Sequence, residues 1–178
     1  MTPPPLEYVP AFVADPQPLL QTLCDSVDWD RRLRARLTAS FGRAYGYSGI
    51  DYPDVPLPPR LADLAARLAQ RLGFLPDNCL LNYYPNGAAS MGFHYDDTAL
   101  LAPDSGIAVL SLGAVRTLRF RPRHQRGAAG PDFPCRLENG SLLFMSAALQ
   151  ADWLHGLPAE ADCGPRLSLT FRKLVEAA

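Results

Sequence analysis

The sequence predicts an α+β fold that is mainly β, a jelly roll supported by helices near its N-terminus. From Cys79 onward, short runs rich in strand-forming residues follow one another. Turn sequences containing Asn, Gly or Pro separate these runs, as at Asn86–Gly87 and Asn139–Gly140. The helical patterns come before the strands. Many short strands with such turns, after a helical opening, are typical of a jelly roll with helical support.

Length and composition favour one soluble globular domain. The chain has 178 residues and a net charge of −1, so we expect a single domain over residues 1–178. No apolar run is long enough to span a membrane, and the first residues lack the pattern of a secretory signal. We therefore expect a cytoplasmic location, and we further expect a monomer. The cysteines are far apart in the chain and are expected to be free thiols: Cys24, Cys79, Cys135 and Cys163.

The elements follow in order along the chain. An extended arm with a short strand near residues 6–9 precedes a short helix over residues 18–29, whose leucines share one face. Residues 31–59 are irregular and rich in Tyr, Gly and Pro. The clearest helix covers residues 58–73, because prolines stand at its start and a glycine follows its last turn. The strands predicted after it lie near residues 79–84, 91–95, 106–112, 117–121, 141–146 and 166–174.

A histidine and an aspartate two residues apart are the first indication of chemistry. His94 and Asp96 would point to the same face of a β-strand. An imidazole and a carboxylate are two of the three ligands in the 2-His-1-carboxylate triad that holds Fe(II). The chain has three histidines. His155, which follows an apolar run, is a better candidate for the third ligand than His124, which lies in an Arg-rich stretch.

The last predicted strand carries arginines on one face. Leu167, Leu169 and Phe171 alternate with Arg166, Ser168, Thr170 and Arg172, so the polar residues share the face opposite the apolar one. This is either an edge strand with a solvated face or a guanidinium presented inside a barrel to a carboxylate. A metal triad together with a carboxylate-binding arginine favours an iron enzyme that uses a keto acid.

With these residues the chain resembles the AlkB family of Fe(II)/2-oxoglutarate-dependent dioxygenases. The resemblance runs from about residue 31 to residue 174, and the matching segments are AYGYSG, NYYPNG, the HxD, SLG, LRFR, GSLLFM, WLHGLP and RLSLTFR. It implies a double-stranded β-helix, or jelly roll, with an N-terminal arm and nucleotide-recognition lid over residues 1–57. A scaffold helix over residues 58–73 and a jelly-roll core over residues 79–174 would complete the single domain.

The resemblance also implies a role for each site residue. The iron ligands would be His94, Asp96 and His155. The residues that hold 2-oxoglutarate would be Asn82, Tyr84, Arg166, Ser168 and Arg172. The residues that meet the substrate would be Tyr45, Tyr47, Ser48, Asp97 and Thr98. Composition alone favours a core role for the tyrosines of this stretch, whereas the resemblance makes Tyr45 and Tyr47 part of the nucleotide-facing lid. The resemblance implies that the cofactor would be Fe(II) and that the cosubstrates would be 2-oxoglutarate and O2.

The implied reaction decarboxylates 2-oxoglutarate to succinate and CO2 and hydroxylates a C–H bond of the substrate. On an N-methyl group this releases formaldehyde, so the expected function is repair of alkylated DNA or RNA by oxidative demethylation. Two arginine clusters would suit a phosphate backbone, although each alone is typical of a solvated surface. The first cluster is Arg31, Arg32, Arg34, Arg36 and Arg43; the second is Arg116, Arg119, Arg121, Arg123 and Arg126, with His124.

One position departs from the family pattern. Nucleic-acid repair members usually carry an acidic residue two positions after the Asp ligand, and Thr98 stands there. Asp97 is acidic, but it would point to the other face if the strand continued. This departure, together with the near-zero net charge, keeps a second function open: hydroxylation or demethylation of a protein or small molecule.

Overall fold

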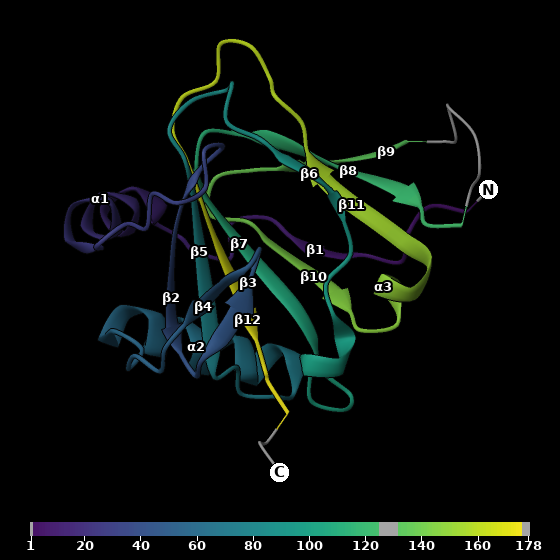
Figure 1. Cartoon of the computed structure of the whole chain (residues 1–178), viewed down its shortest axis with the longest axis horizontal. Helices are drawn as coiled ribbons and strands as arrows, with labels where there is room; N and C mark the ends of the chain where they lie inside the picture. The colour runs from purple at the N-terminus through teal and green to yellow at the C-terminus, as the bar shows by residue number, and fades with distance from the viewer. Residues whose placement is uncertain (1, 125–131, 176–178) are drawn as a thin grey trace.

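The computed structural model describes residues 2–124 and 132–175, and its main structural feature is two antiparallel β-sheets (Figure 1). The larger sheet has the strand order β1-β10-β7-β12-β5-β2, and the smaller sheet has the order β6-β11-β8-β9. Strands of the larger sheet are β1 (Glu7–Val9), β2 (Leu37–Gly42), β5 (Asn78–Tyr84), β7 (Gly106–Gly113), β10 (Leu142–Ser146) and β12 (Arg166–Arg172). Those of the smaller sheet are β6 (Met91–His94), β8 (Arg116–Pro122), β9 (Phe133–Leu137) and β11 (Trp153–Leu157). This arrangement confirms the predicted jelly roll.

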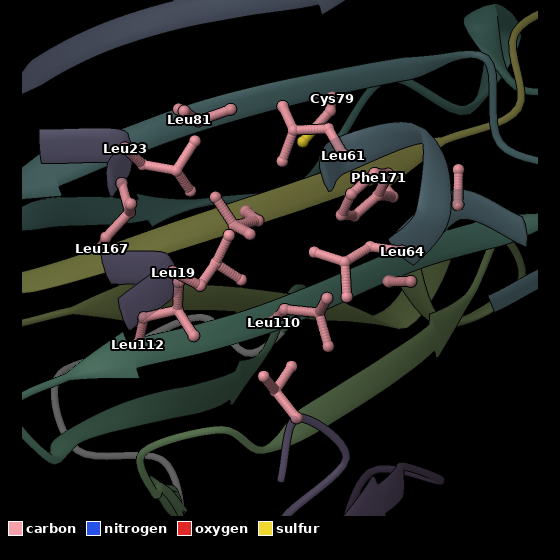
Figure 2. Packing of buried hydrophobic residues seen from close by; sticks show 14 of the residues in the cluster. Leu19, Leu23, Leu61, Leu64, Cys79, Leu81, Leu110, Leu112, Leu167 and Phe171 are labelled. Atoms are coloured by element: carbon pink, nitrogen blue, oxygen red, sulfur yellow. The ribbon is translucent and has the colours of Figure 1, made fainter. Parts of the chain in front are cut away.

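Two helices cover the outer face of the larger sheet. These are α1 (Pro16–Ser26) and α2 (Pro59–Leu72), and they lie on the side away from the smaller sheet (Figure 1). Figure 2 shows leucines of both helices meeting apolar side chains of β5, β7 and β12. The leucine stripe of α2 is buried there, and Gly73 ends the helix with a φ of 80°. The scaffold helix predicted over residues 58–73 is therefore confirmed within one residue at each end.

Strand β12 lies at the centre of the larger sheet, between β5 and β7. Its apolar residues Leu167, Leu169 and Phe171 belong to the core beneath the helices. Its alternate polar residues are buried too, because they face the interior between the two sheets. The interpretation of β12 as an edge strand with a solvated face is therefore wrong, and both of its arginines lie inside the barrel.

Several elements depart from the sequence-based prediction. Strand β2 lies in the stretch predicted to be irregular, and it pairs with β5 as part of the larger sheet. Strands β9 and β11 were not predicted. The first contains Pro134 and is an edge strand, where a missing N–H is tolerated. The second lacks β-branched residues and is held between β6 and β8.

A small hairpin covers the open end of the interior. It consists of β3 (Tyr45–Tyr47) and β4 (Ile50–Tyr52), and it packs through Tyr45, Ile50 and Tyr52 on a third cluster with Leu80 and Leu174. Two short helices complete the described elements: the 3-10 helix η1 (Thr98–Leu100) and α3 (Leu149–Asp152). Within residues 2–124 and 132–175, no helix is long and apolar enough to cross a bilayer. The four cysteines are free.

Candidate active site

The predicted site residues meet in a cavity between the two sheets. This inner cavity is lined by apolar side chains of both sheets and by a polar set from β5, β6, β11, β12 and the hairpin. The polar and aromatic lining consists of Tyr47, Asn82, Tyr84, Met91, His94, Asp96, His155, Arg166, Ser168, Thr170 and Arg172. All three proposed metal ligands and all five proposed 2-oxoglutarate residues are in this lining.

A bulge in β6 aims two of its side chains into the cavity. His94 is opposite His155 on β11, and Met91 is opposite Leu157. Strand β6 therefore contains one more residue than β11 between these two pairs, which is a β-bulge. The rings of His94 and His155 lie 4.4 Å apart between centroids. His124 instead is exposed and contacts the carbonyl oxygen of Ala151 with its ring Nε2. The structure thus places His155, and not His124, beside His94.

Asp96 reaches the site differently from the prediction. Strand β6 ends at His94, so Asp96 lies beyond it and does not share a strand face with His94. A side chain from α3 holds this segment, because the Asp96 backbone N–H donates to Oε1 of Gln150 at 3.0 Å. The carboxylate Oδ1 of Asp96 accepts from Nη2 of Arg172 at 3.1 Å. Its Oδ2 lies 4.0 Å from Nε2 of His155.

The donor atoms suit a divalent metal. Burial and the neighbouring His94 lower the pKa of His155 to about 4, so its imidazole is neutral at pH 7. Burial raises the pKa of Asp96, but the facing Arg172 and the two imidazoles outweigh it and lower the pKa overall, which keeps the carboxylate charged. Nδ1 of His94 contacts the Gly92 carbonyl oxygen at 2.9 Å, which leaves its Nε2 free, as at metal-bound histidines.

The three proposed ligands are near one another but are too widely spaced to form a closed set. Among the residues that the structure describes, no three His, Cys, Asp or Glu side chains are close enough to hold a metal ion as they stand. Two bonds of about 2.0–2.2 Å to one metal ion, at the right angles of a facial set, would place the donor atoms about 3 Å apart. The Asp96 and His155 donor atoms lie 4.0 Å apart, so they would have to move closer together on metal binding. The residue types therefore fit an iron ion, and their present spacing is wider than a bound set requires.

A buried guanidinium without an anion lies deeper in the cavity. Arg166 is 2% exposed, and its Nη2 donates to Oγ of Ser111 at 2.9 Å. Its guanidinium lies 5.4 Å from the centre of the Tyr84 ring, and its Nε has no hydrogen-bond partner among the residues that the structure describes. None of the ion pairs among the described residues includes it. Burial lowers the pKa of Arg166 to about 10, so the group stays charged at pH 7 and requires an anion.

The other proposed 2-oxoglutarate residues surround this guanidinium. Oδ1 of Asn82 accepts from Nε of Arg36 at 2.9 Å, and the Tyr84 hydroxyl contacts the sulfur of Met91 at 3.7 Å. Ser168 is buried on the same face of β12 as Arg166. Arg172 contacts Asp96, and its Nε and Nη1 have no partner. Arg172 is therefore available to an anion while it supports the carboxylate ligand.

A second, outer cavity opens beside the proposed metal ligands. It lies between the hairpin and the end of β6, and it shares Tyr47, Met91, His94 and Asp96 with the inner cavity. The remaining lining residues are Arg36, Tyr45, Gly46, Ser48, Gly92, Phe93, Tyr95, Asp97 and Leu100. The rings of Tyr45 and Tyr47 are stacked, with centroids 6.5 Å apart and planes 20° apart. This cavity can accept a planar group next to the metal ligands.

The two residues after Asp96 are placed differently from what the sequence pattern favours, because Asp97, and not Thr98, lies at the proposed substrate cavity. Asp97 lines the outer cavity, whereas Thr98 is exposed and is not among its lining residues. Asp97 was expected on the opposite face only if the strand continued, and that condition is not met, because β6 ends at His94. Asp97 instead caps η1, with Oδ1 accepting from the backbone N–H of Ala99 at 2.9 Å.

Arg36 connects the hairpin to the core, a role that its place in a basic cluster did not reveal. Besides its bond to Asn82, it donates from Nη2 to the Tyr47 hydroxyl at 2.6 Å. The arginines of the second basic cluster are also not all on one surface. Arg116 is fully buried, and Arg126 lies outside the described residues, whereas Arg119 and Arg121 point outward.

The comparisons with known proteins agree with this geometry. The family model described as "2OG-Fe(II) oxygenase superfamily" matches residues 9–172. The human protein named alpha-ketoglutarate-dependent dioxygenase alkB homolog 3 is 35% identical over 172 residues, which cover 86% of this chain and 60% of that protein. The mouse DNA oxidative demethylase ALKBH2 is 34% identical over 148 residues, which cover 79% of this chain and 62% of that protein.

A solved structure supports the fold alone. The structure of OsALKBH1 superposes with a TM-score of 0.68 at 17% identity, over 97% of this chain and 100% of that chain. The chain spans about 60% of the length of the curated relatives it matches.

Proposed function

This chain belongs to the AlkB family of the 2OG-Fe(II) oxygenase superfamily, and on that premise we propose that it oxidatively demethylates alkylated bases of DNA or RNA. It would use Fe(II), 2-oxoglutarate and O2. The two named relatives support this proposal, since one is called a dioxygenase dependent on alpha-ketoglutarate and the other a DNA oxidative demethylase.

The observation that carries the proposal is the buried, unpaired guanidinium of Arg166. Burying a charged group without a partner of opposite charge costs several kcal/mol. A protein therefore keeps such a buried group where a ligand supplies the opposite charge. A dicarboxylate fits, because one carboxylate can take the fork of Arg166 while the keto acid end faces the proposed metal ligands. Ser111 and Tyr84 fix the guanidinium plane beforehand, through a hydrogen bond and ring contact.

The protein groups have distinct tasks around the metal. His94 and His155 would offer neutral nitrogens and Asp96 a charged oxygen. Bound Fe(II) would supply the activation of O2 that couples decarboxylation of 2-oxoglutarate to hydroxylation of the substrate. Arg172 keeps the Asp96 carboxylate ionised and fixes one of its oxygens. The apolar walls of the inner cavity exclude water from the reacting groups.

The outer cavity suits an extruded base. Tyr47 offers ring surface for stacking, and Ser48, at φ 51° in the hairpin turn, lies beside it. Tyr45 is 8% exposed and supports Tyr47 from the hairpin's apolar cluster. Asp97 places a carboxylate in the lining, which favours a base made cationic by methylation. A base in a duplex would have to be flipped out to enter.

The test is product analysis on oligonucleotides carrying 1-methyladenine or 3-methylcytosine, with Fe(II), 2-oxoglutarate and ascorbate. The proposal expects formaldehyde and the unmodified base in step with succinate. His155→Ala should abolish the products, whereas His124→Ala, a matched change at an exposed histidine, should retain them. Succinate formation without any change in the oligonucleotide would instead favour a protein or small molecule as the substrate.

A further inference from the structure

The outer face of the smaller sheet carries a row of arginines. Residues of β8 alternate, so that Arg119 and Arg121 point away from the interior, with side chains 42% and 51% exposed. Arg136 is exposed on the neighbouring strand β9, where its register partner is Thr117. Arg123 follows the end of β8. Three arginines therefore lie on the outer side of two adjacent strands, and Arg123 follows directly after one of them.

Two of these arginines are stacked on aromatic rings that lead to the outer cavity. The guanidinium of Arg121 lies 3.9 Å from the centre of the Phe93 ring, and that of Arg123 lies 3.7 Å from the centre of the Tyr95 ring. Phe93 and Tyr95 both line the outer cavity. Tyr95 is 46% exposed, whereas Phe93 is partly buried. The row is thus continuous with the site proposed to hold the base.

The charge on this surface is only partly balanced within the protein. Asp132 accepts a hydrogen bond from Arg121 at 3.3 Å and forms an ion pair with Arg119 at 3.4 Å. No ion pair among the described residues includes Arg123 or Arg136. Asp97 is the acidic group at the rim where the row meets the outer cavity. One shared carboxylate for four guanidiniums leaves a net positive surface on a chain whose total charge is −1.

We propose that this surface, the arginine face formed by Arg119, Arg121, Arg123, Arg136, Phe93 and Tyr95, binds the phosphate backbone of the nucleic acid strand whose base enters the outer cavity. The inference rests on the proposed function. Phosphates match the unbalanced charge, and the exposed ring of Tyr95 offers stacking to a flanking base whatever its sequence. The occupant is therefore a single strand of DNA or RNA, held on one side of the target nucleotide.

The first experiment measures binding of an unmodified single-stranded oligonucleotide by fluorescence anisotropy between 50 and 300 mM salt, without iron or 2-oxoglutarate. The double variant Arg119→Gln/Arg121→Gln should weaken binding roughly five- to tenfold at low salt. The slope of log Kd against log salt should fall by about 1.4, since each lost phosphate contact on a single strand accounts for about 0.7. An unchanged slope would overturn the proposal.

The matched control is Arg60→Gln/Arg71→Gln on α2. It removes the same charge from two exposed arginines, one of which is also ion-paired, to Glu7. This helix covers the opposite side of the larger sheet (Figure 1), so the control should bind as the wild type does. If both double variants lose affinity equally, binding follows total charge and the arginine face has no special role.

A change of opposite sign separates binding from damage to the fold. Asp132→Asn removes the carboxylate that Arg119 and Arg121 share, so it should tighten binding about two- to fivefold. A misfolded variant cannot gain affinity. Unchanged or weaker binding by Asp132→Asn, in a protein that melts as the wild type does, would contradict the proposal.

The last comparison keeps this inference distinct from the proposed function. For the Arg119→Gln/Arg121→Gln variant, kcat/KM should fall about five- to tenfold more on a methylated oligonucleotide than on the methylated mononucleotide. Oligonucleotide binding that depends on the arginine face, in a protein without demethylase activity, would refute the function and retain the inference. A poly-glutamate chain of equal charge that competes equally well would show a general anion surface and overturn the assignment to nucleic acid.

Discussion

At the scale of single residues, the guanidinium of Arg166 gives the strongest evidence for the proposed site, because it is buried and has no anionic partner among the described residues. The residue was predicted from alternation along one strand, but its burial and its lack of an ion pair come from tertiary structure. An arginine in a period-2 pattern faces either water or a cavity, and only the position of β12 within the sheet decides between them.

Replacing this guanidinium should leave the fold stable while removing ligand binding. In Arg166→Met, an apolar side chain of similar length replaces an unpaired buried charge, which is commonly neutral or stabilising. Without ligand, we expect its melting temperature to equal or exceed that of the wild type. Saturating 2-oxoglutarate with Mn²⁺ should raise the wild-type melting temperature, as binding to the native state requires, but not that of the variant. An equal ligand-dependent rise in both proteins would remove Arg166 from the 2-oxoglutarate site.

Under the proposed function, the pair Asp97 and Thr98 should decide the preference among alkylated bases. Asp97 lines the outer cavity, so its carboxylate should favour a cationic base by about 1–2 kcal/mol over a neutral hydrogen bond, or roughly tenfold. Asp97→Asn should therefore lower the ratio of kcat/KM for 3-methylcytosine to that for 1-methylguanine by about tenfold.

Thr98→Glu is the companion variant, because it adds a carboxylate one residue further along, at the start of η1. It should change this ratio much less than Asp97→Asn does. The reverse order of effects would show that Thr98, and not Asp97, meets the base.

At the scale of elements, the predictions succeeded where one pattern was long and repeated. Helix α2 and strand β12 were predicted because their apolar residues recur with a fixed period over the whole element. Strand β11 was missed, although it carries His155, because five residues without β-branching give no strand signal and tertiary pairing on both sides forms the strand. The bulge in β6 depends on that pairing and could not be predicted.

Gln150 on the short helix α3 positions the proposed metal ligand Asp96, which lies far from it in the sequence. It is 1% exposed, and its side-chain oxygen fixes the backbone of Asp96. The only sequence signal for this role of Gln150 was one amide side chain within an apolar run. Gln150→Leu should weaken Mn²⁺ binding by about 10- to 100-fold, the usual cost of losing a group that orients a ligand. Titration of Mn²⁺ by electron paramagnetic resonance measures this, and an unchanged affinity would reduce Gln150 to a packing residue.

At the scale of the whole molecule, the site depends on how the two sheets are placed relative to each other. His94 and His155 come from the smaller sheet, Asp96 from the segment that follows β6, and both arginines of β12 from the larger sheet. Arg116 ties the loops at one end of this arrangement. It is fully buried and donates to the carbonyl oxygens of Ala89 at 2.9 Å and Pro158 at 2.6 Å, with a longer bond to Asn86 at 3.4 Å. One loop leads from β5 to β6, and the other from β11 to β12.

Arg116 and Arg166 are equally inaccessible but should respond oppositely to substitution. Arg116→Met leaves at least two buried carbonyl oxygens without donors, at about 1–3 kcal/mol each, so the free energy of unfolding should fall by about 2–5 kcal/mol. Urea unfolding of Arg116→Met and Arg166→Met in parallel provides the measurement, each serving as control for the other. The same loss in both would mean that Arg166 is paired within the protein, and the argument for an anion at the centre of the fold would fail with it.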